Sequence, residues 1–228
     1  MITNLVFSKN RASQLNTLIC SLNEYSGVCF NNKVIYATTD ESFERGYDIL
    51  RDMHSEIEWI EQTALKPDIL ENMNSDYTSF MVDDLIMFKT MPQIPHLEAY
   101  QCFSLRLGKN VREPHLSYPL SLDGHVFRTE DIKPLIEAIK FHNPNKLESR
   151  LQQFKDSWEV LYDYQAMVGI PHNRVSTKSG CAFSGLYSAE LLNKYFIEGY
   201  EIDYNKMDFS NLTNVHSPID YCFKLREC

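Results

Sequence analysis

The chain has 228 residues, 43% of them apolar and 23% charged, and this composition predicts one globular domain spanning residues 1–228. The formal net charge of −9 opposes contact with a phosphate backbone, which excludes nucleic acid as an expected partner. No apolar run is long enough to cross a bilayer and no signal-peptide pattern opens the chain, so we expect a soluble, cytoplasmic protein without a transmembrane segment.

Four strand patterns occur in the first part of the chain, and helical patterns separate them. Each strand pattern is a short run rich in β-branched and aromatic residues. They cover residues 2–7, 33–38, 57–60 and 77–82. Strands that alternate with helices favour a parallel arrangement. We therefore expect an α/β fold, Rossmann-like in its alternation, with a mainly parallel central sheet flanked by helices.

Three helices are expected between these strands. Asn10 is the expected N-cap of the first, Asp40 that of the second, and Pro67 marks the start of the third. The first helix is the clearest, because its apolar residues recur at the spacing of one helical face. Those residues are Leu15, Leu18, Ile19 and Leu22.

The second half of the chain is less regular. Strands are expected over residues 103–107 and 126–127, and a helix over residues 132–139. Asn143 is expected to cap a further helix, and a last one is expected over residues 188–199. The tail after residue 199 shows little pattern.

Two adjacent carboxylates, Asp83 and Asp84, directly follow the strand pattern at residues 77–82. Ligands of parallel sheets bind beyond the carboxyl ends of the strands, where this pair is expected to lie. Carboxylate oxygens suit Mg²⁺ or Mn²⁺, and such an ion can bridge to the phosphate oxygens of a substrate. The pair is therefore a candidate metal site. The alternative is a helix cap beside a solvated aspartate.

The loop after the first strand lacks the glycines of a P-loop or of a dinucleotide-binding motif, which excludes the two commonest nucleotide sites. It is polar and cationic, which suits a base and a ribose, although an ordinary capped loop has the same character. Thr38, at the end of the second strand, is expected at the same edge of the sheet. The candidate nucleotide-binding residues of the loop are Phe7, Ser8, Lys9, Asn10 and Arg11.

Three residues of the second half are further candidates. Asp123 is followed by Gly124, and this pair indicates either a catalytic carboxylate or an ordinary Asp-Gly turn. His125 is a candidate for substrate or metal binding, with a hydrogen-bonded structural role as the alternative. Arg106 interrupts an apolar run, so it either pairs with a buried carboxylate or faces a ligand.

A later segment holds two more candidates. Asn173 and Arg174 lie in a loop that either closes over the site or forms a capped turn.

Five short motifs occur in an order that resembles a GT-A glycosyltransferase family of bacteria and large viruses, which includes capsid-glycan enzymes of chlorella viruses. The resemblance spans most of the chain. The motifs are FSKNR at residues 7–11, VDD at 82–84, FSLRLG at 103–108, YPLSLDGH at 118–125 and PHNRV at 171–175.

The resemblance implies a metal-dependent enzyme that moves a sugar from a UDP-sugar donor to a glycan or glycolipid acceptor. Asp83 and Asp84 stand where such enzymes carry the carboxylates that ligate Mn²⁺ (or Mg²⁺), although no literal D-x-D is present. Asp83, Arg106 and His125 join the expected donor-binding set. His216 is similar in position to the C-terminal metal-binding histidine of some retaining GT-A enzymes. An inverting reaction needs a base for the acceptor hydroxyl, and Asp123 is the candidate.

The expected division of labour places the nucleotide site in about residues 1–85 and the acceptor site in about residues 86–228. Two alternatives stay open. A nucleotidyltransferase shares the sheet and the metal but normally carries a glycine-rich loop after its first strand. A degenerate glycosyltransferase fold that only binds a glycan or a partner protein is the non-catalytic alternative.

Overall fold

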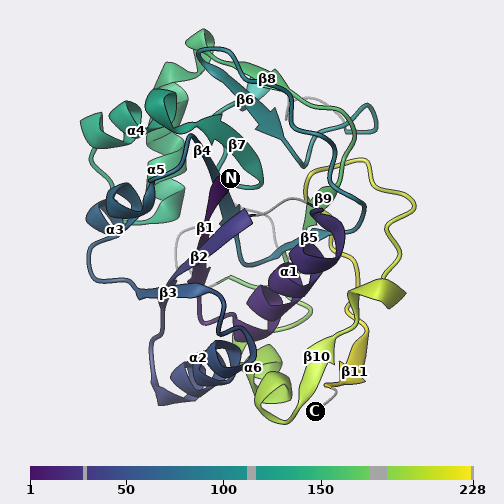
Figure 1. The fold of residues 1–228 in the computed structure, drawn as a ribbon. Helices are drawn as coiled ribbons and strands as arrows, with labels where there is room; N and C mark the ends of the chain where they lie inside the picture. Colours follow the sequence, from purple (N-terminus) through teal and green to yellow (C-terminus); the bar gives the residue numbers. More distant parts are fainter. Residues whose placement is uncertain (28–29, 112–116, 175–183, 227–228) are drawn as a thin grey trace.

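The structure is a computed structural model that describes residues 1–27, 30–111, 117–174 and 184–226 (Figure 1). Val175, which closes the fifth sequence motif, lies outside the described residues. Seven strands form the central sheet. In spatial order they are β3 (Glu58–Glu61), β2 (Phe30–Ala37), β1 (Ile2–Lys9), β4 (Tyr77–Val82), β7 (His125–Arg128), β6 (Gln101–Ser104) and β8 (Glu159–Leu161).

The sheet is mostly parallel. Strands β3, β2, β1 and β4 run in one direction, and β6 pairs with β8 in parallel as well. Only β7 is reversed, because it pairs antiparallel with both β4 and β6. The expected α/β fold with a mainly parallel sheet flanked by helices is thus confirmed.

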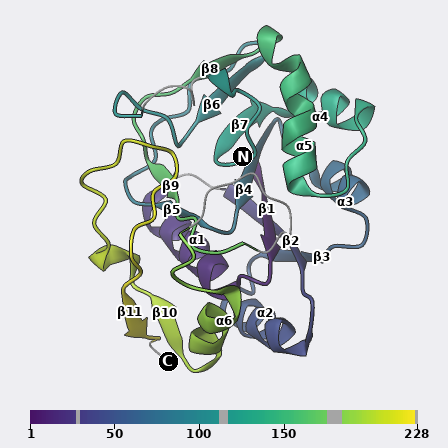
Figure 2. The same cartoon turned by 180° about the vertical axis from the view of Figure 1, so that it is seen from behind.

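Helices cover both faces of the sheet. Helix α1 lies in front of the sheet in Figure 1, and α5 lies in front of it when the molecule is seen from behind in Figure 2. Apolar residues of α1, α2 and α6 belong to one buried cluster, and those of α3, α4 and α5 belong to another. The helices are α1 (Ala12–Tyr25), α2 (Glu41–Met53), α3 (Leu65–Asn72), α4 (Thr129–Ala138), α5 (Pro144–Leu151) and α6 (Ala189–Ile197).

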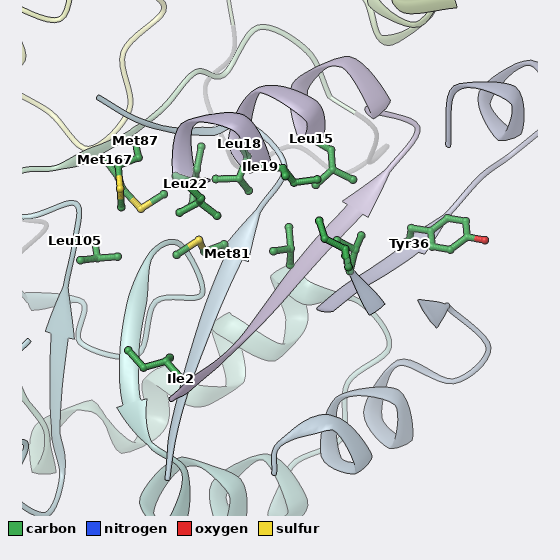
Figure 3. Packing of buried hydrophobic residues seen from close by; sticks show 14 of the residues in the cluster. Ile2, Leu15, Leu18, Ile19, Leu22, Tyr36, Met81, Met87, Leu105 and Met167 are labelled. Atoms are coloured by element: carbon green, nitrogen blue, oxygen red, sulfur yellow. The ribbon is translucent and has the colours of Figure 1, made fainter. Parts of the chain in front are cut away.

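The alternation of side chains along β1 explains why two helical layers are needed. Val6 points into the cluster under α1, whereas Leu5 and Phe7 point into the opposite cluster, because successive strand residues face opposite sides. Both faces of the strand are therefore apolar and both must be covered. Figure 3 shows the first layer, with the apolar residues predicted for α1 directed at the sheet and Leu22 lying over Met81 of β4.

Most predicted helix boundaries agree with the structure, and three differ. One is the start of α4, which begins at Thr129 and not at residue 132. Asp40 caps α2 by accepting the backbone N–H groups of Ser42 and Phe43, as expected. The N-cap of α1 is Arg11 instead of Asn10, because Asn10 adopts a left-handed backbone with φ of 57°. Helix α3 begins at Leu65, so Pro67 lies inside its first turn, where a missing N–H costs nothing.

Helices of the second half match the expectations closely. The side chain of Asn143 accepts the N–H of Lys146 and caps α5 as predicted. Ser188 caps α6, and Gly199 follows that helix with φ of 90°. The 3-10 segment η2 (Gln152–Ser157) continues from α5.

Several strands outside the central sheet were not expected. Strand β5 (Leu85–Met87) pairs antiparallel with β9 (Met167–Gly169), and β10 (Tyr200–Ile202) pairs antiparallel with β11 (Phe223–Leu225). The 3-10 segment η3 (Tyr204–Lys206) also lies in the tail. The expected strand over residues 103–107 is wrong in its second half, because β6 ends at Ser104.

Within the described ranges, none of the helices combines the length and the apolar character that crossing a bilayer requires.

Candidate functional site

One edge of the central sheet collects the loops that carry the predicted site residues. Strands β1 and β4 are parallel, so Arg11 and the aspartates that follow β4 lie at the same edge. Strand β7 is antiparallel to β4 and begins at this edge, which brings Asp123 to it. Strand β6 is antiparallel to β7 and ends there, which adds Arg106. The topology therefore assembles residues from four separate segments.

Asp83 lies at the centre of the first cluster, and its side chain is 4% exposed. Its Oδ2 accepts hydrogen bonds from Ser8 Oγ at 2.9 Å and from the backbone N–H of Lys9 at 3.1 Å. Its Oδ1 is 2.8 Å from Nη1 of Arg11. Burial raises the pKa of Asp83, and the Arg11 guanidinium opposes that rise. The FSKNR loop and the first aspartate thus form one bonded unit.

Tyr47 of α2 forms hydrogen bonds with this unit. Its hydroxyl lies 2.5 Å from Ser8 Oγ and accepts the N–H of Arg11 at 3.3 Å. Because the Ser8 proton is directed at Asp83, the Tyr47 hydroxyl donates to Ser8. Burial raises the pKa of Tyr47, so this proton stays in place at every physiological pH.

Arg11 joins both carboxylates of the pair. Its Nη1 lies 2.8 Å from Asp83 and 3.1 Å from Oδ2 of Asp84. On the other side of the guanidinium, Nε donates to Oδ1 of Asn173 at 2.8 Å and Nη2 donates to the Asn173 backbone carbonyl at 2.5 Å. Asn173, which the sequence offered with Arg174 as a candidate loop residue, therefore lies beside the carboxylate pair.

The chemical type of the side chains at this edge fits a divalent ion. Asp83 and Asp84 supply adjacent carboxylate oxygens at the ligand-binding edge of the sheet, as Mg²⁺ and Mn²⁺ require. Across the described ranges no group of three or more His, Cys, Asp and Glu residues converges on one point, so the pair is an incomplete set. Phosphate oxygens of a substrate and water would have to complete it.

Arg106 and Asp123 form the second cluster. Nη1 of Arg106 is 3.0 Å from Oδ2 of Asp123, and Nε2 of His216 approaches the same oxygen at 3.4 Å. Nη2 of Arg106 donates to Ser121 Oγ at 2.9 Å. Arg106 thus pairs with the partly buried carboxylate of Asp123, and its predicted contact with a ligand stays a prediction. Arg106 follows β6 in a loop and does not interrupt a strand.

The charges around Asp123 decide its protonation state. Burial opposes ionisation, but Arg106 and His216 outweigh it and hold the pKa of Asp123 well below its usual range. Glu148 of α5 lies close by, where Oε1 accepts from Ser121 Oγ at 2.8 Å and from the N–H of Leu122 at 3.0 Å. Burial raises the pKa of Glu148, and the negative charge of Asp123 adds to that rise.

Backbone pairing with Gly169 holds His216 at this cluster. Gly169 of β9 forms a bridge with His216, and a Cβ on Gly169 would lie 2.5 Å from Cδ2 of the imidazole. Gly169 also pairs with Leu85, which directly follows Asp84. Neighbouring strands lie about 4.8 Å apart, so two such steps place His216 about 10 Å from Leu85. The two clusters are therefore neighbours.

Not every predicted residue presents its side chain to this edge. Phe7 is 5% exposed and stacks on Phe80, so only its backbone reaches the site. Thr38 donates to Glu44 of α2 at 2.8 Å and faces that helix. His125 is 2% exposed, and its Nδ1 donates to the Ser121 carbonyl at 3.2 Å. Burial and Arg106 lower the pKa of His125 to about 3, so the imidazole is neutral.

Sequence reasoning missed Tyr47 and Glu148, and it left His216 outside the main set. Tyr47 and Glu148 lie on helices whose apolar stripes gave no sign that one polar atom points to the sheet edge. A glycine within a strand often marks close approach of another backbone, so Gly169 was a sequence signal for the segment that carries His216.

The sequence matches no protein-family profile and no curated protein. Among solved structures, one similar chain is the bifunctional glycosyltransferase WbbM, with 10% identity and a TM-score of 0.46 over 75% of this chain and 39% of that one. Another is the galactosyltransferase LgtC with donor and acceptor sugar analogues, with 11% identity and a TM-score of 0.43 over 75% of each chain.

A third similar chain is a mutant of Drosophila β1,4-galactosyltransferase 7 in complex with manganese, UDP-Gal and xylobiose. It has 11% identity and a TM-score of 0.38, over 99% of this chain and 95% of that one. The chain spans 39% of the length of WbbM and three quarters or more of the other two. Likenesses of this size do not assign the chain to a family.

Proposed function

We propose that this protein is a glycosyltransferase that moves a sugar from a nucleoside-diphosphate donor, UDP-sugar by the sequence resemblance, to a glycan or glycolipid acceptor. The observation that carries the proposal is that two charged clusters lie at the same edge of the sheet. The first joins Arg11 to Asp83 and Asp84, and the second joins Arg106 to Asp123. The first cluster suits the stabilisation of a diphosphate leaving group, and the second offers a carboxylate to accept the proton of an acceptor hydroxyl.

The donor site comprises the loop of residues 8–11 and the aspartate pair. The loop supplies polar groups for the base and ribose, and Arg11 supplies a guanidinium whose fork suits phosphate oxygens. Asp83 and Asp84 are the residues that would hold Mn²⁺ or Mg²⁺. Such an ion, when bound, stabilises negative charge on the departing diphosphate. Asp83 itself fixes the loop through Ser8 and the Lys9 backbone.

Asp123 acts on the acceptor. Its carboxylate accepts the hydroxyl proton as the acceptor oxygen bonds to the anomeric carbon, while the bond from that carbon to the diphosphate breaks and the configuration inverts. Arg106 and His216 keep Asp123 ionised, so the carboxylate is ready at every physiological pH. Its low pKa makes it a weak base in the ground state, and proton transfer therefore accompanies attack.

A thermal-shift screen of nucleotides and nucleotide sugars, with and without Mn²⁺, tests this proposal directly. A ligand that binds only the folded chain raises the melting temperature. We expect uridine diphosphates to stabilise the protein more strongly than adenosine or guanosine diphosphates, and UDP release from one UDP-sugar to follow. Absence of stabilisation by any nucleotide sugar would overturn the proposal.

A further inference from the structure

Arg11 is held too firmly to be an incidental surface residue. Its side chain is 10% exposed, and its guanidinium contacts Asp83, Asp84 and Asn173 at distances between 2.5 and 3.1 Å. The four contacts use three nitrogen atoms and surround the group on opposite sides. A planar fork with this many partners loses little mobility on further binding, so the position is pre-organised.

The backbone before Arg11 is equally constrained. Asn10 has φ of 57°, a left-handed conformation that asparagine tolerates better than most residues. Its side chain donates to Thr39 Oγ1 at 2.8 Å and accepts the Thr39 N–H at 3.0 Å. The turn is thus tied to the end of β2, and it directs Arg11 across the sheet edge onto the aspartates.

Arg11 stands where a divalent ion would have to bind. Both carboxylates direct one oxygen at its Nη1, and the other oxygen of Asp83 is committed to Ser8 and Lys9. Two carboxylates against one guanidinium leave one negative charge uncompensated. An ion alone would turn that balance positive and would meet the guanidinium at close range, where like charges repel strongly.

A nucleotide changes this balance. Its diphosphate brings about two negative charges, which offset the two positive charges of the ion and offer oxygens both to the ion and to Arg11. Arriving together, the two ligands leave the charge of the site unchanged. Arriving alone, either one adds charge of a single sign to a partly buried cluster.

We propose that Arg11 is a resident counter-ion that keeps divalent ions off Asp83 and Asp84 until a nucleotide binds. When the diphosphate arrives, Nη1 exchanges its carboxylate partners for phosphate oxygens and Asn173 retains the other side of the guanidinium. Ion and nucleotide therefore bind as a pair. The identity of the nucleotide rests on the proposed function, whereas the competition between Arg11 and the ion does not.

The test is Mn²⁺ binding, followed by the electron paramagnetic resonance signal of free Mn²⁺, in the wild type and in Arg11→Gln. Without nucleotide, Arg11→Gln should bind Mn²⁺ at least 10-fold more tightly than the wild type. UDP should tighten Mn²⁺ binding to the wild type by at least 10-fold and to the variant by much less. Equal Mn²⁺ affinity of the two proteins without nucleotide would overturn the proposal.

Two further variants keep the outcome interpretable. Arg51→Gln makes the same change of charge at another arginine that pairs with two carboxylates, Glu44 and Asp48 on α2, and it should leave Mn²⁺ affinity unchanged. If Arg11→Gln does not fold, Arg11→Lys retains the charge but cannot bridge both aspartates and Asn173. It should bind Mn²⁺ several-fold more tightly than the wild type, and wild-type affinity would count against the proposal.

The design also separates this inference from the proposed function. If UDP and other nucleotides fail to bind with or without Mn²⁺, the donor assignment is wrong, while the nucleotide-free comparison still decides whether Arg11 excludes the ion. If UDP binds and wild-type Mn²⁺ affinity is the same with and without it, the donor assignment survives and the role of Arg11 is wrong.

Discussion

Asp123 is the single residue whose replacement separates chemistry from binding. Asp123→Asn keeps the size of the side chain and removes the carboxylate that would take the acceptor proton. We expect turnover to fall by about 10²–10⁴-fold while the Kd for the donor stays within a factor of about two. Steady-state transfer and calorimetric donor binding measure the two quantities. Near-normal transfer, or a product that retains the donor configuration, would contradict the assignment.

The depressed pKa of Asp123 also has a consequence for stability in acid. A carboxylate with a lower pKa in the folded than in the unfolded chain contributes stability that is present above the unfolded value, about 3.9, and is lost as pH falls through the folded value. The stability advantage of the wild type over Asp123→Asn should therefore shrink below about pH 4. Urea unfolding of both proteins between pH 7 and pH 3 measures the difference. A constant or growing advantage would exclude the ion pair as its source.

Among the elements, β9 connects the two clusters through Gly169. Gly169→Ala would place a Cβ against the His216 ring, which must then shift from its position beside Asp123. We expect a loss of about 1–3 kcal/mol in the free energy of unfolding, the usual range for overpacking. Denaturant titration of the variant gives this number.

A double-mutant cycle identifies the cause of that loss. If the clash with the imidazole is responsible, His216→Ala should absorb most of the cost of Gly169→Ala when the two changes are combined. Additive losses would show instead that the alanine disturbs the pairing of β9 with β5.

At the scale of the whole molecule, the central sheet combines strands from the predicted nucleotide half and the predicted acceptor half. Its two tryptophans report on opposite ends, since Trp59 lies on β3 and Trp158 immediately precedes β8. Each single-tryptophan variant, Trp59→Phe or Trp158→Phe, keeps one tryptophan as a fluorescence probe. If residues 1–228 form one domain, the fluorescence transition of each variant in urea should coincide with its loss of circular dichroism. The two variants should also unfold at the same urea concentration once the effect of each substitution on stability is subtracted. Separate transitions would indicate two folding units.

Sequence periodicity determined the first half of the fold. The strands β1 to β4 and the caps of α2 and α5 follow from local patterns, because burial on one helical face and capping by one side chain are decided within a few residues. The short strands β5 and β9, and the antiparallel pair of β10 and β11, could not be predicted. Each has three residues, and its pairing partner lies at least twenty residues away.

The same distinction between local pattern and tertiary pairing applies to the candidate site. The sequence by itself marked five charged residues as candidates, namely Arg11, Asp83, Asp84, Arg106 and Asp123. The first four lie beside apolar strand patterns, and Asp123 was marked by the glycine that follows it and by the family resemblance. Only the tertiary structure decided their partners. Arg11 pairs with both aspartates and Arg106 with Asp123, while His216 arrives through a bridge to Gly169. Ion pairing depends on distances of a few ångströms between segments that the topology brings together, and no local pattern encodes those distances.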